Sequence, residues 1–125
     1  MRQLIGSLAL GAAFLTSLPA HANDSPQISQ GAAHFQEKCA LCHGATGRGG
    51  EGYPNPIWGA GAQIKKFKTA QGLFEYHQLL MPFNDPTLLD DEQKMAVTAY
   101  VLANHGVMGR GETLDPAKAP QITIP

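Results

Sequence analysis

The two cysteines of the chain, Cys39 and Cys42, lie three positions apart, and His43 follows directly. Thiols and an imidazole at this spacing suit three kinds of chemistry: a redox disulfide, part of a metal site, or the covalent attachment of haem. Each of these needs different partners elsewhere, so the rest of the sequence decides among them.

A disulfide or a zinc ion fits the rest of the sequence poorly. A thioredoxin-type redox pair needs a strand followed by a helix, whereas the pair here ends a predicted helix that follows no strand. A structural zinc ion needs four ligands, and the chain has no second cysteine pair. His34, His77 and His105 are scattered without ligand spacing.

Haem attachment accounts for every part of the motif. Two thioether bonds need two cysteines one helical turn apart, and the residue after them then places its imidazole under the iron. A covalent haem also supplies the apolar core that a small chain with long loops otherwise lacks. We therefore predict one covalent haem c, held by Cys39 and Cys42, with His43 as an axial ligand of the iron.

The N-terminal residues 1–22 have the pattern of a secretory signal peptide. Arg2 precedes an apolar run from Leu4 to Leu18, and a small-x-small cleavage site ends at Ala22. The run contains glycines and a serine and is shorter than the roughly 20 residues of a spanning helix. We expect cleavage after Ala22, export to the periplasm, no later membrane span, and one domain over residues 23–125.

The charge of the chain is nearly balanced. It has 9 basic and 10 acidic residues and a formal net charge of −1, which gives no indication of nucleic acid binding. The one local concentration, KKFK at residues 65–68, is typical of a solvated face.

Three segments with the apolar spacing of amphipathic helices are expected to position these residues. The predicted helices are residues 29–42 capped by Ser29, residues 70–80 capped by Thr69, and residues 91–104 with a capping box of Asp90 and Gln93. The glycine-rich segment 44–61 and the proline-containing tail 109–125 are expected to be irregular, with the tail over the surface. Because no strand alternation is present, the predicted fold class is all-α.

The ligand on the other face of the iron decides whether a haem carries electrons or meets a small molecule. The candidates are Met81, Met95, Met108, His77 and His105. Met81 ends a predicted helix and precedes a proline, which biases it toward extended backbone in a loop that can cover a haem. We predict Met81 as the sixth ligand, with His77 as its main competitor. With both axial positions filled, the iron transfers single electrons and binds no substrate.

Four segments resemble class I cytochromes c along nearly all of residues 23–125. They are GAAHFQEKCALCHG, GYPNPIWGAG, LLMPF and LDDEQKMAVTAYVLANHG. The resemblance implies three main helices and long loops around one haem, with Gly31 and Phe35 packed against Tyr100. It also implies that a proline carbonyl, of Pro54 or Pro56, accepts the N–H of His43. Trp58 then either lines the haem pocket or is a simple core aromatic.

The C-terminal half is similar to the cytochrome subunits of bacterial sulfite dehydrogenases. The similarity lies in MPFNDPTLLDDEQKMAVTAYVLANHGVM and LDPAKAPQITIP. It implies a protein that is no enzyme on its own and accepts electrons as a subunit or partner of a molybdenum-containing sulfite dehydrogenase, passing them to a downstream cytochrome or oxidase. Two alternatives stay open: a freely diffusing carrier for another periplasmic dehydrogenase or a terminal oxidase, and a haem enzyme or gas sensor with an open sixth site.

Overall fold

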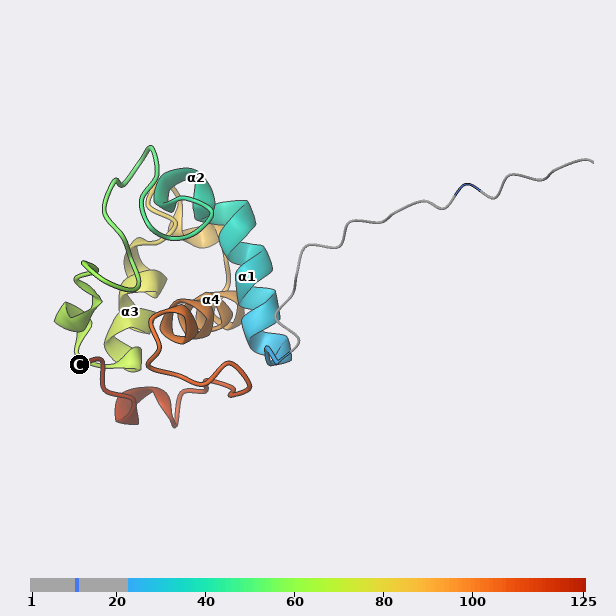
Figure 1. Cartoon of the computed structure of the whole chain (residues 1–125). Coiled ribbons are helices and arrows are strands. Elements are labelled where there is room, and N and C mark those ends of the chain that lie inside the picture. The colour runs from blue at the N-terminus through green and yellow to red at the C-terminus, as the bar shows by residue number, and fades with distance from the viewer. Residues whose placement is uncertain (1–10, 12–22) are drawn as a thin grey trace, which may run out of the picture.

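The computed structural model describes Gly11 and residues 23–125 (Figure 1). Its helices are α1 (Pro26–Lys38), α2 (Ala40–His43), α3 (Ala70–Leu80) and α4 (Asp91–Asn104), with short 3-10 helices η1 (Ile64–Phe67), η2 (Pro86–Leu88) and η3 (Ala119–Gln121). Over the described ranges the only β pairing is an isolated bridge between Thr69 and Thr123, so the all-α prediction is confirmed. The signal peptide predicted for residues 1–22 lies outside the described residues except for Gly11, and stays a prediction.

No helix within the described part of the chain is both long and apolar enough to cross a membrane. The longest, α4, has 14 residues.

The first helix begins earlier than predicted and is interrupted before the histidine. Ser25, and not Ser29, is its cap: the Ser25 hydroxyl accepts a hydrogen bond from Ile28 N at 3.2 Å. Pro26 occupies the first turn, where its missing N–H is not needed. At Cys39 the backbone leaves helical geometry (φ −121°, ψ −34°), and the short helix α2 then carries Cys42 and His43.

The predicted bounds of α3 and α4 are confirmed. The Thr69 hydroxyl accepts a hydrogen bond from Gly72 N at the start of α3. At the start of α4, Asp90 and Gln93 form the predicted capping box, each side chain accepting from the backbone of the other. Gly106 follows the end of α4 with a φ of +79°, a conformation that favours glycine.

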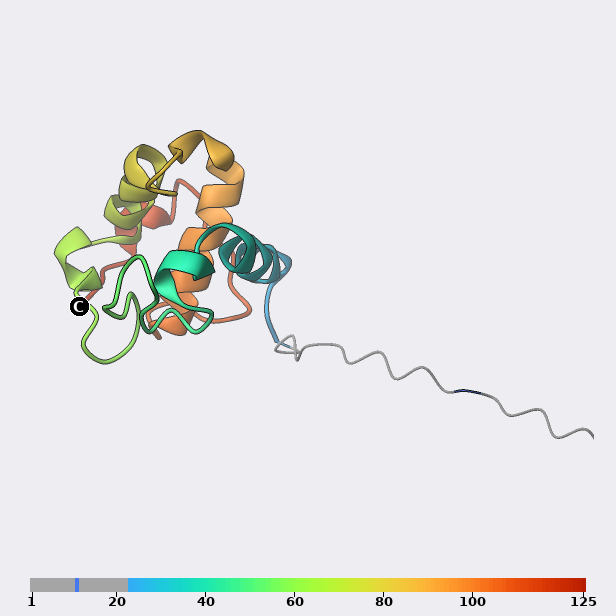
Figure 2. The same cartoon turned by 90° about the horizontal axis from the view of Figure 1, so that it is seen from above.

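Helix α1 crosses α4 at close range, as Figures 1 and 2 show. A Cβ at Gly31 would lie 2.0 Å from the carbonyl oxygen of Ala96 and 3.0 Å from Cβ of Tyr100. The rings of Phe35 and Tyr100 pack at 5.5 Å between centroids. The packing of Gly31, Phe35 and Tyr100 that the family resemblance implied is therefore confirmed.

Replacing Gly31 by alanine is expected to destabilise the protein, because the added methyl group must push α1 away from α4. Forced overpacking of this kind costs about 1–3 kcal/mol of unfolding free energy. Guanidinium unfolding of the haem-loaded protein measures it. Gly111→Ala is the control, since its added Cβ meets only Asn23 O at 3.7 Å, and we expect a change below about 0.5 kcal/mol there. Equal effects of the two variants would contradict the tight crossing.

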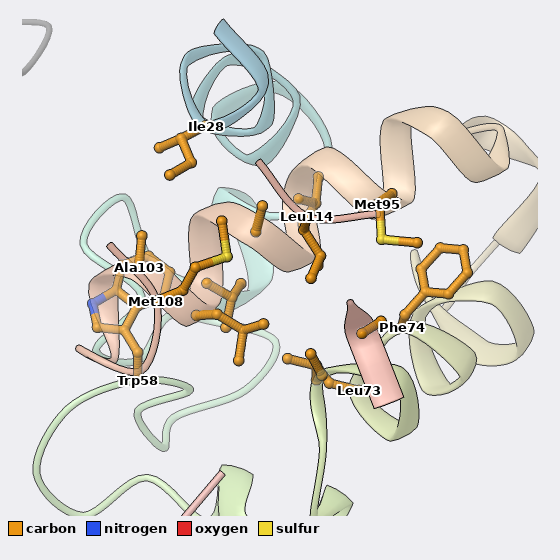
Figure 3. Packing of buried hydrophobic residues seen from close by; sticks show 14 of the residues in the cluster. Ile28, Trp58, Leu73, Phe74, Met95, Ala103, Met108 and Leu114 are labelled. Carbon is orange, nitrogen blue, oxygen red and sulfur yellow. The ribbon is translucent and has the colours of Figure 1, made fainter. Parts of the chain in front are cut away.

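The C-terminal tail is part of the core, which corrects the prediction that it only lies over the surface. Leu114 and Ile124 are 2% and 3% exposed. Backbone hydrogen bonds join the tail to the start of α3, with Ala70 N donating to Ile122 O (2.9 Å) and Ile124 N donating to Lys68 O (2.8 Å). Figure 3 shows Leu114 within the same cluster as Met95 and Leu73. Three prolines conceal this role in the sequence, because the tail buries isolated side chains without any helical period.

Candidate haem site

A cavity of about 700 Å³ lies between α2, α3, α4 and the loop that follows α3. Its wall contains Cys39, Cys42 and His43 from one side and Met81 from the loop. The structure therefore brings together the four residues that sequence reasoning selected, from segments about 40 positions apart in the chain.

The rest of the wall is largely apolar. Side chains from α1, η1, α3 and α4 line it, among them Phe35, Ile64, Leu73, Val97 and Val101. An apolar cavity whose wall includes two thiols, a thioether and the imidazole that follows the second thiol fits a covalently attached haem, because the macrocycle is apolar and these are its attachment and axial-ligand groups.

His43 is held at the edge of the cavity by the fold of α2 and the glycine loop after it. His43 N donates to Cys39 O at 3.0 Å, and the imidazole meets the Tyr53 ring edge-on at 5.3 Å. Burial lowers the pKa of His43 below its ordinary value, which favours the neutral imidazole that a metal ligand must be.

The expected hydrogen bond from His43 to a proline carbonyl is not formed. Nδ1 of His43 is buried, and within the described residues it has no hydrogen-bond partner. Pro56 lines the cavity, whereas Pro54 does not. The carbonyl of Pro54 lies instead beside Gly49, where an added Cβ would approach it to 2.3 Å.

Trp58 is placed in the core and not in the wall of the cavity. It is 8% exposed and packs against Phe35 and Tyr100, with ring centroids 5.1 Å and 5.5 Å away. Of the two roles that the sequence left open, the structure supports the core aromatic.

Met81 is positioned by the end of α3. Its backbone is extended (φ −121°, ψ 140°), and its N–H still donates to His77 O at 3.2 Å as the last bond of the helix. The helix ends here because Pro82 disfavours helical geometry at the residue before it. The half-buried Met81 side chain lines the same cavity as Cys39, Cys42 and His43.

Three of the other candidate ligands are placed elsewhere. Met95 and Met108 are buried in the hydrophobic core, where Figure 3 shows their side chains. Neither lines the cavity. His105 accepts a hydrogen bond from Gly59 N at its Nδ1 atom (3.0 Å), also outside the cavity. Of the other candidate ligands, only His77 lines the same cavity as Met81.

The protonation of His77 follows from its hydrogen bonds. Thr98 donates its hydroxyl proton to Lys94 O (2.7 Å), so it must accept from Nδ1 of His77, also at 2.7 Å. Nδ1 therefore carries a proton. Burial, followed by electrostatic interactions with His43 and Lys94, lowers the pKa of His77 to about 4. His77 is accordingly neutral at physiological pH.

We expect His77 to make the protein less stable in acid. Its pKa is lower in the folded state (about 4) than in the unfolded state (6.5), so the unfolded state binds the proton first. The free energy of unfolding that His77 contributes is fully present above pH 6.5. It falls by about 3 kcal/mol as the pH drops to 4 and changes little below that pH.

Denaturant titrations of the haem-loaded protein between pH 7 and pH 4 check this. His77→Asn keeps an N–H for Thr98 but does not titrate, so its stability should fall less. His34→Asn, at a position that does not line the cavity, is the control and should keep the wild-type dependence. A His77→Asn curve parallel to the wild-type curve would show that His77 does not carry the effect.

Sequence reasoning missed two polar residues near the cavity: Lys94, which lines it, and Thr98, which is hydrogen-bonded to His77. Both are buried in α4. The sequence signal for Lys94 was its position: Lys94, Val97 and Val101 recur at helical spacing, and all three line the cavity from α4.

The alternatives to haem receive no support from the geometry. Within residues 23–125, no group of three or more histidine, cysteine or acidic side chains is placed to hold a metal ion. Burial, and then the neighbouring Cys42, raises the pKa of the Cys39 thiol to about 11, whereas a redox dithiol needs a lowered thiol pKa.

Comparisons with known proteins agree with this site. Residues 26–101 match the family model described as cytochrome c oxidase, cbb3-type, subunit III. A curated relative, the cbb3-type cytochrome c oxidase subunit FixP of Sinorhizobium medicae (strain WSM419), is 32% identical over 87 residues, which are 61% of this chain and 29% of the relative. The chain thus spans less than a third of the length of that relative.

Two solved structures are similar in fold. The sulfane dehydrogenase SoxCD from Paracoccus pantotrophus aligns with a TM-score of 0.66 and 20% identity, covering 95% of this chain and 69% of that one. The thiosulfate dehydrogenase TsdBA from Marichromatium purpuratum aligns with a TM-score of 0.51 and 29% identity, covering 69% of this chain and 19% of that one.

Proposed function

The chain belongs to the cytochrome c family described as cytochrome c oxidase, cbb3-type, subunit III, and it binds haem c covalently as that family does. We propose that four residues hold this haem. Cys39 and Cys42 form the two thioether bonds. His43 and Met81 are the axial ligands of the iron. The observation that carries this assignment is that the four side chains line one and the same apolar cavity.

Bound haem supplies a one-electron couple, and the protein determines its potential and its access. The apolar side chains of the cavity wall would limit the contact of the bound haem with water. A methionine thioether favours the reduced iron more than a second imidazole would. Because His43 and Met81 fill both axial positions, the domain exchanges electrons and does not bind a substrate at the metal.

We further propose that this electron carrier works in the periplasm as the electron-accepting subunit or partner of a molybdenum-containing sulfite dehydrogenase. The C-terminal motifs support it, and so does the likeness in fold to two structures described as a sulfane dehydrogenase and a thiosulfate dehydrogenase. The fold of SoxCD aligns with 95% of this chain, so the likeness includes the tail that packs beside α3.

Stopped-flow mixing with a molybdenum-containing sulfite dehydrogenase and sulfite tests the partner. We expect reduction of the haem within the enzyme's turnover time, and co-purification of the two proteins from the native organism. Recovery of the chain as a lone monomer, together with slow reduction by the sulfite system, would overturn this proposal.

The similarity to FixP favours a second candidate, a carrier that delivers electrons to a terminal oxidase. The same stopped-flow experiment distinguishes the two when the reduced protein is mixed with a cbb3-type oxidase. Fast oxidation without fast reduction by the sulfite system would select the second candidate.

A further inference from the structure

Lys94 is a buried lysine in the middle of the cytochrome fold. Its side chain is on α4, the residue is 3% exposed, and it lines the haem cavity. Its ammonium group donates two hydrogen bonds to backbone carbonyls, to Gln78 O at 3.0 Å and to Pro86 O at 2.6 Å. Within the described residues it pairs with no carboxylate.

In the sequence, the residues that carry these two carbonyls lie on either side of Met81. Gln78 is in the last turn of α3, where carbonyl groups lack partners within the helix. Pro86 begins η2, after the loop. One ammonium group on α4 thus holds both ends of the segment 79–85, which carries Met81.

The segment 79–85 has few other ties to the fold. Its described backbone bonds are local, such as Met81 N to His77 O and Asp85 N to Pro82 O. Three of its apolar side chains, Leu79, Leu80 and Phe83, are exposed. Without Lys94, little in this segment would resist movement away from the cavity.

We propose that Lys94 is a positioning residue for Met81: its two hydrogen bonds hold the segment 79–85 against α4 and so keep the thioether in the cavity. This inference rests on the proposed role of Met81 as sixth ligand. A second consequence follows from the charge. A buried ammonium beside a centre that gains an electron favours the reduced state, so Lys94 also raises the reduction potential.

The test compares the wild-type holoprotein with Lys94→Met, which keeps the length and apolar stem of the side chain and removes the donors. The measurements are the thioether-to-iron charge-transfer band of the oxidised protein during heating, carbon monoxide association with the reduced protein, and the reduction potential. A hydrogen bond to a charged group contributes at least about tenfold to an equilibrium. We therefore expect the carbon monoxide rate to rise about tenfold or more, the band to be lost at lower temperature, and the potential to fall.

Met95→Ala is the matched control, since Met95 is the adjacent residue of α4 and is buried but does not line the cavity. It should lower the unfolding temperature while the band and the carbon monoxide rate stay as in the wild type below that temperature. If Lys94→Met does not accumulate with haem, Lys94→Gln replaces it in the test. Its side chain is shorter and neutral, and we expect the same changes in the band, the carbon monoxide rate and the potential.

The outcomes separate this inference from the proposed function through Met81→Ala, measured in the same series. If Met81→Ala loses the band while the Lys94 variants keep wild-type band stability, carbon monoxide rate and potential, the positioning role of Lys94 is wrong and Met81 remains the ligand. If Met81→Ala leaves the band unchanged, both assignments are wrong.

Discussion

Met81→Ala is expected to abolish the thioether-to-iron charge-transfer band of the oxidised protein and to lower its reduction potential strongly. The methyl group of alanine cannot reach the metal, and the loss of the thioether removes the ligand that favours reduced iron. Axial ligands and their surroundings shift haem potentials over a range of about 0.8 V, so this is among the largest effects that one substitution can have here. Visible and near-infrared spectra and a redox titration measure it.

Carbon monoxide binding shows what replaces Met81. An open sixth position would bind carbon monoxide rapidly, whereas ligation by His77, which shares the cavity, would give a low-spin haem that binds it slowly. The double variant Met81→Ala with His77→Asn separates these two results. Met108→Ala is the control, because Met108 is buried outside the cavity. An unchanged spectrum in Met81→Ala, or a lost band in Met108→Ala, would refute the assignment of Met81.

The double variant Cys39→Ser with Cys42→Ser is expected to lose covalent haem and, with it, most of the cooperative fold. A cavity of about 700 Å³ is large for a domain of this size. Unfilled cavity volume costs roughly 24 cal/mol per Å³. After a discount for its opening to solvent and for collapse of its walls, the cost is on the order of 10 kcal/mol, which equals the whole stability of a typical domain.

Intact mass and the haem spectrum report attachment, and circular dichroism during heating reports the fold. The single variants are the control: Cys39→Ser and Cys42→Ser each keep one thioether, so each should retain haem and a cooperative transition at lower temperature. A double variant that keeps covalent haem would show that the cysteines are not the attachment points. A haem-free double variant that unfolds as cooperatively as the wild type would show that the haem is not needed to fill the cavity.

Much of the fold follows from local patterns. The bounds of α3 and α4 were predictable because a cap, an apolar period and a stop signal all lie within or beside each helix. The start of α1 was not, because Pro26 and two serines allow either of two caps. Ser25 is the cap, and its N–H also donates to Arg110 O (2.7 Å), a contact with the tail that no local pattern contains.

The burial of the C-terminal tail was also not predictable from the sequence. Its buried residues are single and irregularly spaced, so neither helical nor strand period marks them. Asp24 and Arg110 pair at 2.6 Å across most of the length of the chain, which helps to hold the tail against the start of α1. Contacts of this kind depend on which segments the fold brings together.

The sequence alone determined that this protein carries covalent haem, since two cysteines and a histidine on adjacent turns need only local geometry to form that motif. It also narrowed the sixth ligand to a few side chains. Only the tertiary structure reduced these candidates to two: Met81 and His77 line the cavity, while Met95 and Met108 are core residues. The link from Lys94 to the Met81 segment likewise required the structure, because it joins α4 to backbone carbonyls 8 and 16 positions away. A carbonyl group carries no signature in a sequence, so its partners become visible only when the chain is folded.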